Sequence, residues 1–186
     1  MSSLHPVSGS AEQITGLLAD WDRAEDPAPL VIETSGSSGR PKRVQLSRTA
    51  MRASVAATHE RLGGPGQWVL TVPPTYVAGV QVLFRGVRAG AVPVIAAVSD
   101  LDAAHAATTH ERTYLSLVPT QLHRALRDHD QAAALARFSG VLVGGGPARP
   151  DDLELARQRD IRVVRTYGMS ETCGGCVYDG RPLDGV

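Results

Sequence analysis

A regular alternation of short apolar segments with helix-patterned segments is the feature of this 186-residue sequence that most restricts its fold. Between residues 48 and 168, the expected helices alternate with short, continuously apolar segments that are typical of buried strands. Strands of this kind, joined through helices, form parallel sheets that are covered on both faces. The sequence therefore predicts an α/β fold with a mostly parallel sheet flanked by helices.

The expected elements divide the chain into a lead-in, a hairpin and the alternating region. In the lead-in, residues 1–29, apolar residues at helical spacing predict one amphipathic helix from Ile14 to Trp21. Strands over 30–35 and 44–47, joined by a glycine- and serine-rich loop, predict a hairpin. The strands expected after the hairpin cover residues 67–73, 91–98, 114–119, 140–145 and 161–168. The expected helices cover residues 48–62, 77–91, 101–112, 120–130 and 150–160, with Gly90 ending the second and Thr120 as the N-cap of the fourth.

The loop between the two hairpin strands has the composition of a phosphate-binding loop. Glycines allow backbone N–H groups to turn toward one ligand, hydroxyl groups supply further donors, and a lysine adds a compact positive charge. The residues that supply these groups are Thr34, Ser35, Gly36, Ser37, Ser38, Gly39 and Lys42. Lys42 is the only lysine in the chain, and every other Lys or Arg position is an arginine.

Two observations limit this interpretation of the loop. Arg40 and Pro41 stand before Lys42 and a strand follows it, so the loop does not match the G-x-x-x-x-G-K-[ST] pattern that opens a helix. Glycine, serine and proline are also the residues of ordinary surface turns. On composition alone a surface turn is therefore the alternative, and the retained lysine favours the phosphate loop.

Three segments in the same order resemble those of the adenylate-forming superfamily, which includes acyl-CoA synthetases, luciferases and peptide-synthetase adenylation domains. TSGSSGRPKRV resembles its phosphate loop, GGGP at residues 144–147 resembles its adenine-binding turn, and TYGMSET at residues 166–172 resembles its Y-G-x-[ST]-E segment. More narrowly, SLVPTQLHRAL, LVGGGPARPDDLELA and YGMSETCGGCVYDGRPLDGV resemble the o-succinylbenzoate–CoA ligases of menaquinone biosynthesis. The resemblance covers residues 30–186.

The resemblance implies a reaction in which ATP and a carboxylic acid form an acyl-adenylate and pyrophosphate, after which coenzyme A (CoA) displaces AMP. ATP and Mg²⁺ would be the cofactors and CoA a co-substrate. The loop over residues 34–42 would hold the β- and γ-phosphates. Adenine and AMP binding would fall to Gly144, Gly145, Gly146, Tyr167, Gly168, Met169 and Ser170. Tyr167 would stack on adenine, Ser170 would reach the α-phosphate, and Glu171 would bind Mg²⁺, which prefers carboxylate and phosphate oxygens. The alternatives are an ordinary strand-to-helix turn for the glycines and a solvated carboxylate for Glu171.

The acid substrate would lie beside the segment PPTYVAG and the helix that follows it. Tyr76 departs from the common pattern of the resemblance, which often has histidine there. Arg85 is a candidate partner for the carboxylate of o-succinylbenzoate that is not activated, because a planar guanidinium suits a carboxylate. A surface arginine is the alternative. Pro119 and Thr120 are further candidates for the same pocket.

Composition and motifs argue against several other functions. The 19 acidic residues balance the 19 residues that are lysine or arginine, which disfavours nucleic acid as a partner. No signal peptide and no apolar segment long enough to span a bilayer is visible, so we expect a cytoplasmic protein without membrane insertion. Cys173 and Cys176 form one C-x-x-C without a second pair, a weak metal signal, and are interpreted as part of the substrate-side loop. An exposed sheet edge would allow a homodimer.

The resemblance also implies a part of the ligase that is not in this sequence. Complete ligases carry a C-terminal domain whose lysine contacts the reacting carboxylate, whereas the only lysine of this chain is already assigned to the phosphate loop. We therefore expect residues 30–186 to form the nucleotide- and acid-binding part of the large N-terminal domain, as a truncated chain that is inactive alone. The alternatives are a non-catalytic module that binds a nucleotide or an aryl acid, and a ligase for another carboxylic acid.

Overall fold

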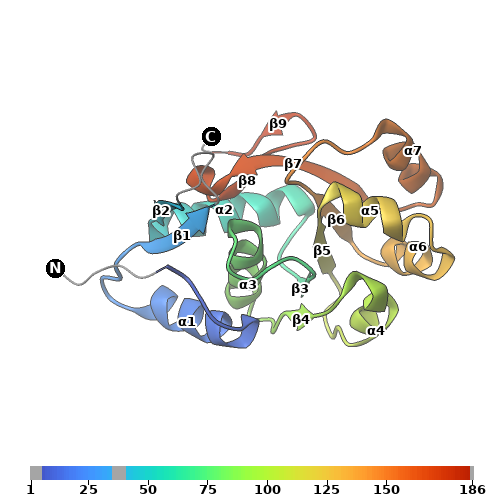
Figure 1. Ribbon diagram of the computed structural model, residues 1–186. Coiled ribbons are helices and arrows are strands. Elements are labelled where there is room, and N and C mark those ends of the chain that lie inside the picture. Colours follow the sequence, from blue (N-terminus) through green and yellow to red (C-terminus); the bar gives the residue numbers. More distant parts are fainter. Residues whose placement is uncertain (1–5, 35–40, 185–186) are drawn as a thin grey trace.

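The strands are arranged in one large sheet and one separate hairpin (Figure 1). The computed structural model describes residues 6–34 and 41–184. The hairpin consists of β1 (Leu30–Thr34) and β2 (Lys42–Leu46), which pair antiparallel as expected. The sheet has the order β4-β3-β5-β6-β7-β8-β9. Its strands are β3 (Gln67–Leu70), β4 (Val94–Ile95), β5 (Thr113–Leu117), β6 (Gly140–Val143), β7 (Val163–Met169), β8 (Gly174–Tyr178) and β9 (Arg181–Pro182).

The sheet is mostly parallel, as the alternating pattern predicts. Strands β4, β3, β5, β6 and β7 pair parallel, whereas β7, β8 and β9 pair antiparallel. The antiparallel part follows the last strand expected from the sequence. It depends on a tight turn at Asp179 and Gly180, whose positive φ angles of 51° and 78° are those of a two-residue hairpin turn. The Asp-Gly pair is the local signal for this hairpin.

The helices lie in two groups (Figure 1). The first group, which packs with the hairpin, is α1 (Ala11–Arg23), α2 (Arg48–Leu62) and α3 (Val77–Ala89). The second group is α4 (Leu101–Ala106), α5 (Pro119–Ala125), α6 (His129–Ala136) and α7 (Pro150–Gln158). Short 3₁₀ turns η1 (Val98–Asp100) and η2 (Ser170–Thr172) complete the described elements. Within the described ranges, every helix is too short or too polar to cross a bilayer.

Each central strand contributes side chains to two separate hydrophobic cores. Trp68 lies in the core beneath the first helix group, and its neighbour Val69 lies in the core beneath the second. Tyr114 and Leu115 divide in the same way. Because successive side chains of a strand point to opposite faces, this division places the sheet between the two groups. The continuously apolar strands of the sequence are explained by this burial on both faces.

Several expected elements have other bounds in the structure. The helix expected over 101–112 ends at Ala106 as α4. Thr120 is not an N-cap, because α5 begins at Pro119 and Val118 occupies the cap position, where its N–H donates to the Gln121 side chain at 2.8 Å. The expected helix over 120–130 is divided at Asp128, whose carboxylate caps α6 by accepting two backbone N–H bonds at 3.0 Å. The strand expected over 91–98 is reduced to the two residues of β4.

Candidate functional site

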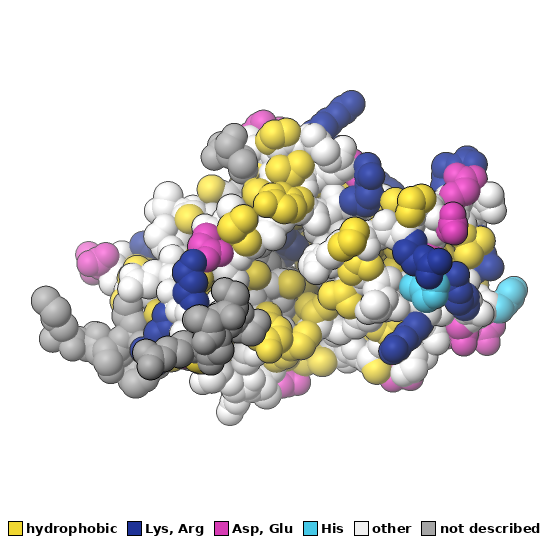
Figure 2. Space-filling model, turned by 45° about the horizontal axis from the view of Figure 1, so that its top comes forward, with side chains coloured by type: hydrophobic (Ala, Val, Ile, Leu, Met, Phe, Trp, Pro, Cys, Tyr) yellow, Lys and Arg dark blue, Asp and Glu magenta, His cyan; other side chains and the backbone are white. Residues whose placement is uncertain are grey.

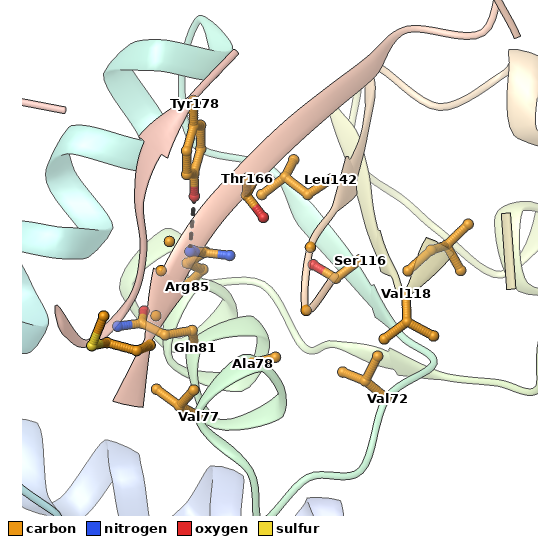
Figure 3. Close-up of a pocket in the computed structure, with 17 residues that line it drawn as sticks. Val72, Val77, Ala78, Gln81, Arg85, Ser116, Val118, Leu142, Thr166 and Tyr178 are labelled. Atoms are coloured by element: carbon orange, nitrogen blue, oxygen red, sulfur yellow. Dashed lines mark hydrogen bonds between the residues drawn. The ribbon is translucent and has the colours of Figure 1, made fainter. Parts of the chain in front are cut away.

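A cavity of about 150 Å³ lies where α3 meets the carboxyl ends of the parallel strands β5 and β6 and the antiparallel strands β7 and β8. Figure 2 shows hydrophobic side chains gathered around a hollow in the middle of one face, and Figure 3 shows the lining residues. Ligands of open α/β sheets bind at the carboxyl ends of the strands. The polar side chains that line the cavity belong to Gln81, Arg85, Ser116, Thr166 and Tyr178.

Arg85 is a buried cation within this lining. Its side chain extends from α3 toward Tyr178 (Figure 3), and the residue is only 4% exposed. One guanidinium nitrogen, Nη2, donates to Thr58 Oγ1 and Tyr178 Oη, each at 3.3 Å, and the guanidinium carbon lies 4.8 Å from the Trp68 ring centroid. In residues 6–34 and 41–184, no carboxylate forms an ion pair with Arg85. The guanidinium therefore retains its full attraction for an anion that enters the cavity.

His59 on α2 is a partly buried histidine near this cation. Burial, and to a lesser extent the nearby positive charges of Arg85 and Arg88, together lower the pKa of His59 from 6.5 to about 4. The side chain is consequently neutral at pH 7, and a second cation next to Arg85 is avoided.

The lowered pKa of His59 predicts a loss of stability in weak acid. Since histidine in the unfolded chain titrates near 6.5 and His59 in the folded chain near 4, the unfolded state binds more protons between these values. The free energy of unfolding should therefore fall as the pH drops from about 7 toward 4, and His59→Gln should reduce this fall. Urea unfolding at pH 7 and pH 4.5 measures it. His129→Gln, at a fully exposed histidine, is the control, and an unchanged pH dependence in His59→Gln would contradict the prediction.

The expected phosphate loop and the Y-G-x-[ST]-E segment meet in the structure. Lys42 Nζ at the start of β2 lies 2.5 Å from Glu171 Oε1 in η2, although 129 residues separate them. The hydrogen bond from Lys42 lowers the pKa of the Glu171 carboxyl. Both side chains are exposed, so the pair contributes little to folding stability, and its significance is that it brings the two motifs together.

Of the other residues predicted for the phosphate loop, only Thr34 lies within the described residues. Thr34 ends β1 opposite Lys42, and its Oγ1 donates to the Lys42 carbonyl at 3.4 Å. Ser35, Gly36, Ser37, Ser38 and Gly39 lie outside the described residues.

Two of the glycines expected to bind the nucleotide, Gly144 and Gly168, stand where a side chain would collide with the fold. A Cβ on Gly144 would lie 2.3 Å from Thr166 Oγ1, and one on Gly168 would lie 1.9 Å from the Gly174 carbonyl oxygen. Gly145 has a φ of 80°, in the left-handed region that favours glycine. The glycines at 144 and 168 are therefore required by the close packing of β6, β7 and β8 beside the cavity.

The expected adenine-binding residues border a second hollow. Gly146 and Tyr167 both line a space of about 370 Å³ beside β7. Tyr167 is 62% exposed, so the face of its ring is available for stacking on a planar group. Met169, in contrast, lines the first cavity together with Gly144, Gly145 and Gly168. Ser170 precedes Glu171 in η2. The two hollows therefore lie on either side of the same short segment.

Three residues expected to contact the acid do not line the cavity. Tyr76 occupies the N-cap position of α3 and is 55% exposed. Pro119 and Thr120 lie in the first turn of α5, whereas the preceding Val118 does line the cavity. Cys173 and Cys176 are free and buried, and both lie outside this lining.

Sequence reasoning missed the residues that surround Arg85. Thr58 falls on the buried face of α2 with Val55 and Leu62, and Gln81 is a polar residue within the most apolar helix. A polar residue on an otherwise apolar helix face was the available signal for both. Tyr178 and Trp68 carry no comparable local signal, because aromatic residues in strands are ordinary core residues.

Comparisons with known proteins show the family to which the chain belongs. The family model described as AMP-binding enzyme matches residues 6–185. A probable 2-succinylbenzoate–CoA ligase of Mycobacterium tuberculosis is 50% identical over 190 residues, which cover 99% of this chain and 50% of that protein. The 2-succinylbenzoate–CoA ligase of Bacillus subtilis is 32% identical over 155 residues, 82% of this chain and 32% of that protein.

Solved structures show the same likeness. An o-succinylbenzoate coenzyme A synthetase from Bacillus subtilis in complex with AMP has a TM-score of 0.74 and 29% identity, over 87% of this chain and 36% of that one. The same enzyme in complex with ATP and magnesium ion has a TM-score of 0.72 and 30% identity, over 83% of this chain and 35% of that one. The chain spans about half the length of the M. tuberculosis relative and about a third of the B. subtilis proteins.

Proposed function

Because the chain belongs to the AMP-binding enzyme family, we propose that it is the ATP- and acid-binding part of a ligase that joins o-succinylbenzoate to coenzyme A. In the proposed reaction, one carboxylate of the acid attacks the α-phosphate of ATP and pyrophosphate leaves. Coenzyme A then displaces AMP from the acyl-adenylate to give the thioester. The 2-succinylbenzoate–CoA ligases among the relatives support this choice of reaction and its place in menaquinone biosynthesis.

One observation carries the proposal: a single cavity is lined both by Arg85 and by residues of the nucleotide segments. Gly144 and Gly168 lie on the strand side of the cavity, and Arg85 lies on its helix side. An acid held by the guanidinium would therefore lie against the segment expected to bind AMP. This juxtaposition is what an adenylating enzyme requires, since the carboxylate and the α-phosphate must approach within bonding reach.

The substrate o-succinylbenzoate suits the cavity because it has two carboxylates and an aromatic ring. Only one carboxylate can be activated, and the other would be an unpaired buried anion unless the protein supplied a cation. Arg85 supplies it. Val72, Val118 and Leu142 give the cavity an apolar lining against which an aromatic ring can pack.

The residues also fit ATP with Mg²⁺. Mg²⁺ is usually held by one or two carboxylates together with substrate phosphates. Glu171 supplies one carboxylate, its lowered pKa keeps it ionised, and no group of three or more metal-binding side chains occurs in the part of the chain described. Lys42 lies beside Glu171 and would bind the β- or γ-phosphate. When bound, Mg²⁺ would neutralise phosphate charge, and Tyr167 with Gly146 would take the adenine ring.

Thermal unfolding in the presence of single ligands tests the proposal. We expect ATP·Mg²⁺, AMP and o-succinylbenzoate each to raise the melting temperature of the 186-residue chain, because a ligand that binds only the folded state stabilises it. Benzoate should give a smaller shift. If neither ATP·Mg²⁺ nor AMP raised the melting temperature, the proposal that the site binds a nucleotide would be contradicted. A larger shift with another aryl acid would favour a different substrate.

Pyrophosphate exchange separates binding from catalysis. Little exchange is expected from this chain alone, since its only lysine is Lys42 and the resembled ligases use a further lysine at the reacting carboxylate. Robust exchange by the purified chain would contradict this expectation, because it would show that the chain forms the acyl-adenylate without the further lysine. Ligand-induced stabilisation without exchange is also what a non-catalytic binding module would show, and addition of the C-terminal part of a relative would distinguish the two.

The remaining partner assignments follow from charge and from the sheet edges. We infer that the chain acts on small molecules rather than on nucleic acid, because its acidic and basic residues balance. A cytoplasmic location stays a prediction. A homodimer stays a prediction. The edge strand β4, where Ile95 is 49% exposed, is the surface through which it would form.

A further inference from the structure

Arg85 is held in the cavity lining by two hydroxyl groups from other elements. Its Nη2 donates to Tyr178 Oη in β8 and to Thr58 Oγ1 in α2, each at 3.3 Å. The two hydroxyl oxygens are 3.1 Å apart and are hydrogen-bonded to each other. All three residues are at most 4% exposed, so water competes little for these bonds. The three side chains therefore form a closed triangle that fixes one side of the guanidinium.

The contacts of the guanidinium nitrogens show which of them an anion can reach. Nη2 is occupied by the two hydroxyl groups. Within residues 6–34 and 41–184, Nε is completely buried without a hydrogen-bond partner, whereas Nη1 also has no partner but is not completely buried. Figure 3 shows this second terminal nitrogen of Arg85 directed away from the bond to Tyr178, into the space beside the strands. Nη1 is therefore the nitrogen that is open to the cavity.

The groups that hold Arg85 are neutral. A carboxylate in place of either hydroxyl would form an ion pair with the guanidinium and would repel an anionic ligand. A hydroxyl accepts a hydrogen bond and leaves the net positive charge in place. The ring of Trp68, whose centroid lies 4.8 Å from the guanidinium carbon, is a further neutral contact. The arrangement thus fixes the guanidinium without neutralising it.

The place of the Tyr178 ring depends on Gly175, which lies three residues earlier in β8. A Cβ at residue 175 would lie 2.7 Å from Tyr178 Cε1 and 3.3 Å from Tyr178 Oη. Any other residue there would force the ring to move, because glycine alone permits so close an approach. Both residues line the cavity. The Tyr178 hydroxyl is therefore held at one place beside Arg85.

We propose that Tyr178 is a positioning residue that makes the cavity selective for an acid with a second carboxylate. The inference rests on the proposed function and deepens it by naming the group that orients Arg85 toward the ring carboxylate of o-succinylbenzoate. Tyr178 Oη holds Nη2, and the planar guanidinium then presents Nη1 to the cavity. Because Tyr178 is completely buried, its hydroxyl acts through Arg85 and does not itself bind the acid.

Calorimetric titration of Tyr178→Phe with two acids tests this role. The variant retains the ring and removes only the hydroxyl that holds Nη2. We expect it to bind o-succinylbenzoate about 3- to 10-fold more weakly, the effect of one hydrogen bond. The acid 4-oxo-4-phenylbutanoate has no ring carboxylate for Arg85 to bind, so Tyr178→Phe and the unmodified chain should bind it equally well.

Tyr114→Phe is the matched control. It removes another completely buried tyrosine hydroxyl from the same hydrophobic core. The Tyr114 hydroxyl donates to the Gly64 carbonyl at 2.9 Å and forms no hydrogen bond with Arg85 in the described part of the chain. This variant should bind both acids with unchanged affinity, whereas a general loosening of the core would weaken binding in both tyrosine variants.

A double-mutant cycle shows whether Tyr178 acts through Arg85. In Arg85→Gln the charge that Tyr178 orients is absent, so the addition of Tyr178→Phe should cause no further loss of o-succinylbenzoate affinity. Independent roles would instead give fold-losses that multiply in the double variant. If Tyr178→Phe does not fold, Thr58→Val removes the other acceptor of Nη2, takes its place in the cycle and should show the same selective loss.

The outcomes separate this inference from the function on which it rests. Three results would each overturn the role of Tyr178 and leave the proposed function standing: unchanged o-succinylbenzoate affinity in Tyr178→Phe, equal weakening of both acids, or multiplied losses in the double variant. An unmodified chain that binds neither o-succinylbenzoate nor ATP·Mg²⁺ overturns both.

Discussion

Replacing Arg85 by glutamine is expected to weaken the binding of o-succinylbenzoate by about 10- to 100-fold, the value of one charge-assisted hydrogen bond of about 1.5–3 kcal/mol. The guanidinium is buried, has no carboxylate partner in the described chain, and lines the cavity, so its charge is directed to a ligand. Glutamine retains a hydrogen-bond donor but not the charge. Isothermal titration calorimetry of the folded variant measures the change, and ATP·Mg²⁺ affinity should be unchanged.

A second ligand shows whether Arg85 binds the carboxylate that is not activated. The acid 4-oxo-4-phenylbutanoate lacks the ring carboxylate of o-succinylbenzoate and should bind the unmodified chain and Arg85→Gln equally well. Arg124→Gln, at an exposed arginine, is the matched control for the general loss of one positive charge. If Arg85→Gln weakened the binding of both acids equally, Arg85 would act on the cavity in general and would not bind the ring carboxylate.

The replacement of Lys42 by methionine is expected to weaken the binding of ATP·Mg²⁺ by about 10- to 100-fold, again the value of a charge-assisted bond to phosphate. Lys42 is the only lysine, and its ammonium lies within 2.5 Å of Glu171 at the end of the expected phosphate loop. AMP lacks the β- and γ-phosphates, so its affinity should not change. Calorimetric titration with both nucleotides gives the comparison.

The neighbouring residue provides the control for Lys42. Arg43 is equally exposed and lies 3.2 Å from Glu33 on the same hairpin, so Arg43→Met removes a similar charge at a similar place. It should leave ATP·Mg²⁺ binding unchanged. The melting temperature should also be unchanged in Lys42→Met, because an exposed ion pair contributes little to stability. Equal losses for ATP and AMP would place Lys42 away from the terminal phosphates.

Most of the sheet could be predicted from local patterns. Runs such as 67–73 and 140–145 are mostly apolar because each strand faces two cores, and a run of that kind is visible without knowledge of the fold. The hairpin of β1 and β2 was predictable for a similar reason, since a glycine- and serine-rich loop separates two strand segments. The boundaries at Pro119 and Asp128 were missed, because capping depends on which side chain reaches which backbone group.

The candidate site could be predicted only as separate motifs. The loop before Lys42, the glycines at 144–146 and the segment around Glu171 are recognisable in sequence, and the structure brings Lys42 to Glu171. The expected acid contacts were less accurate. Arg85 lines the cavity, whereas Tyr76, Pro119 and Thr120 do not, because helix starts at these positions direct the segments away from the lining.

By itself, the sequence determined the fold class, the hairpin and the chemistry of the three motifs, because periodicity, turn residues and motif spacing are properties of neighbouring residues. Only the tertiary structure decided which of the many arginines lies in a cavity. It also decided that neutral hydroxyls from Thr58 and Tyr178 surround Arg85, and that Gln81 joins the cavity to the turn at Cys173. These contacts connect residues far apart in the chain. Burial excludes water and so strengthens the interaction of an unpaired charge or amide with a ligand. It arises only when the sheet and its helices have packed together.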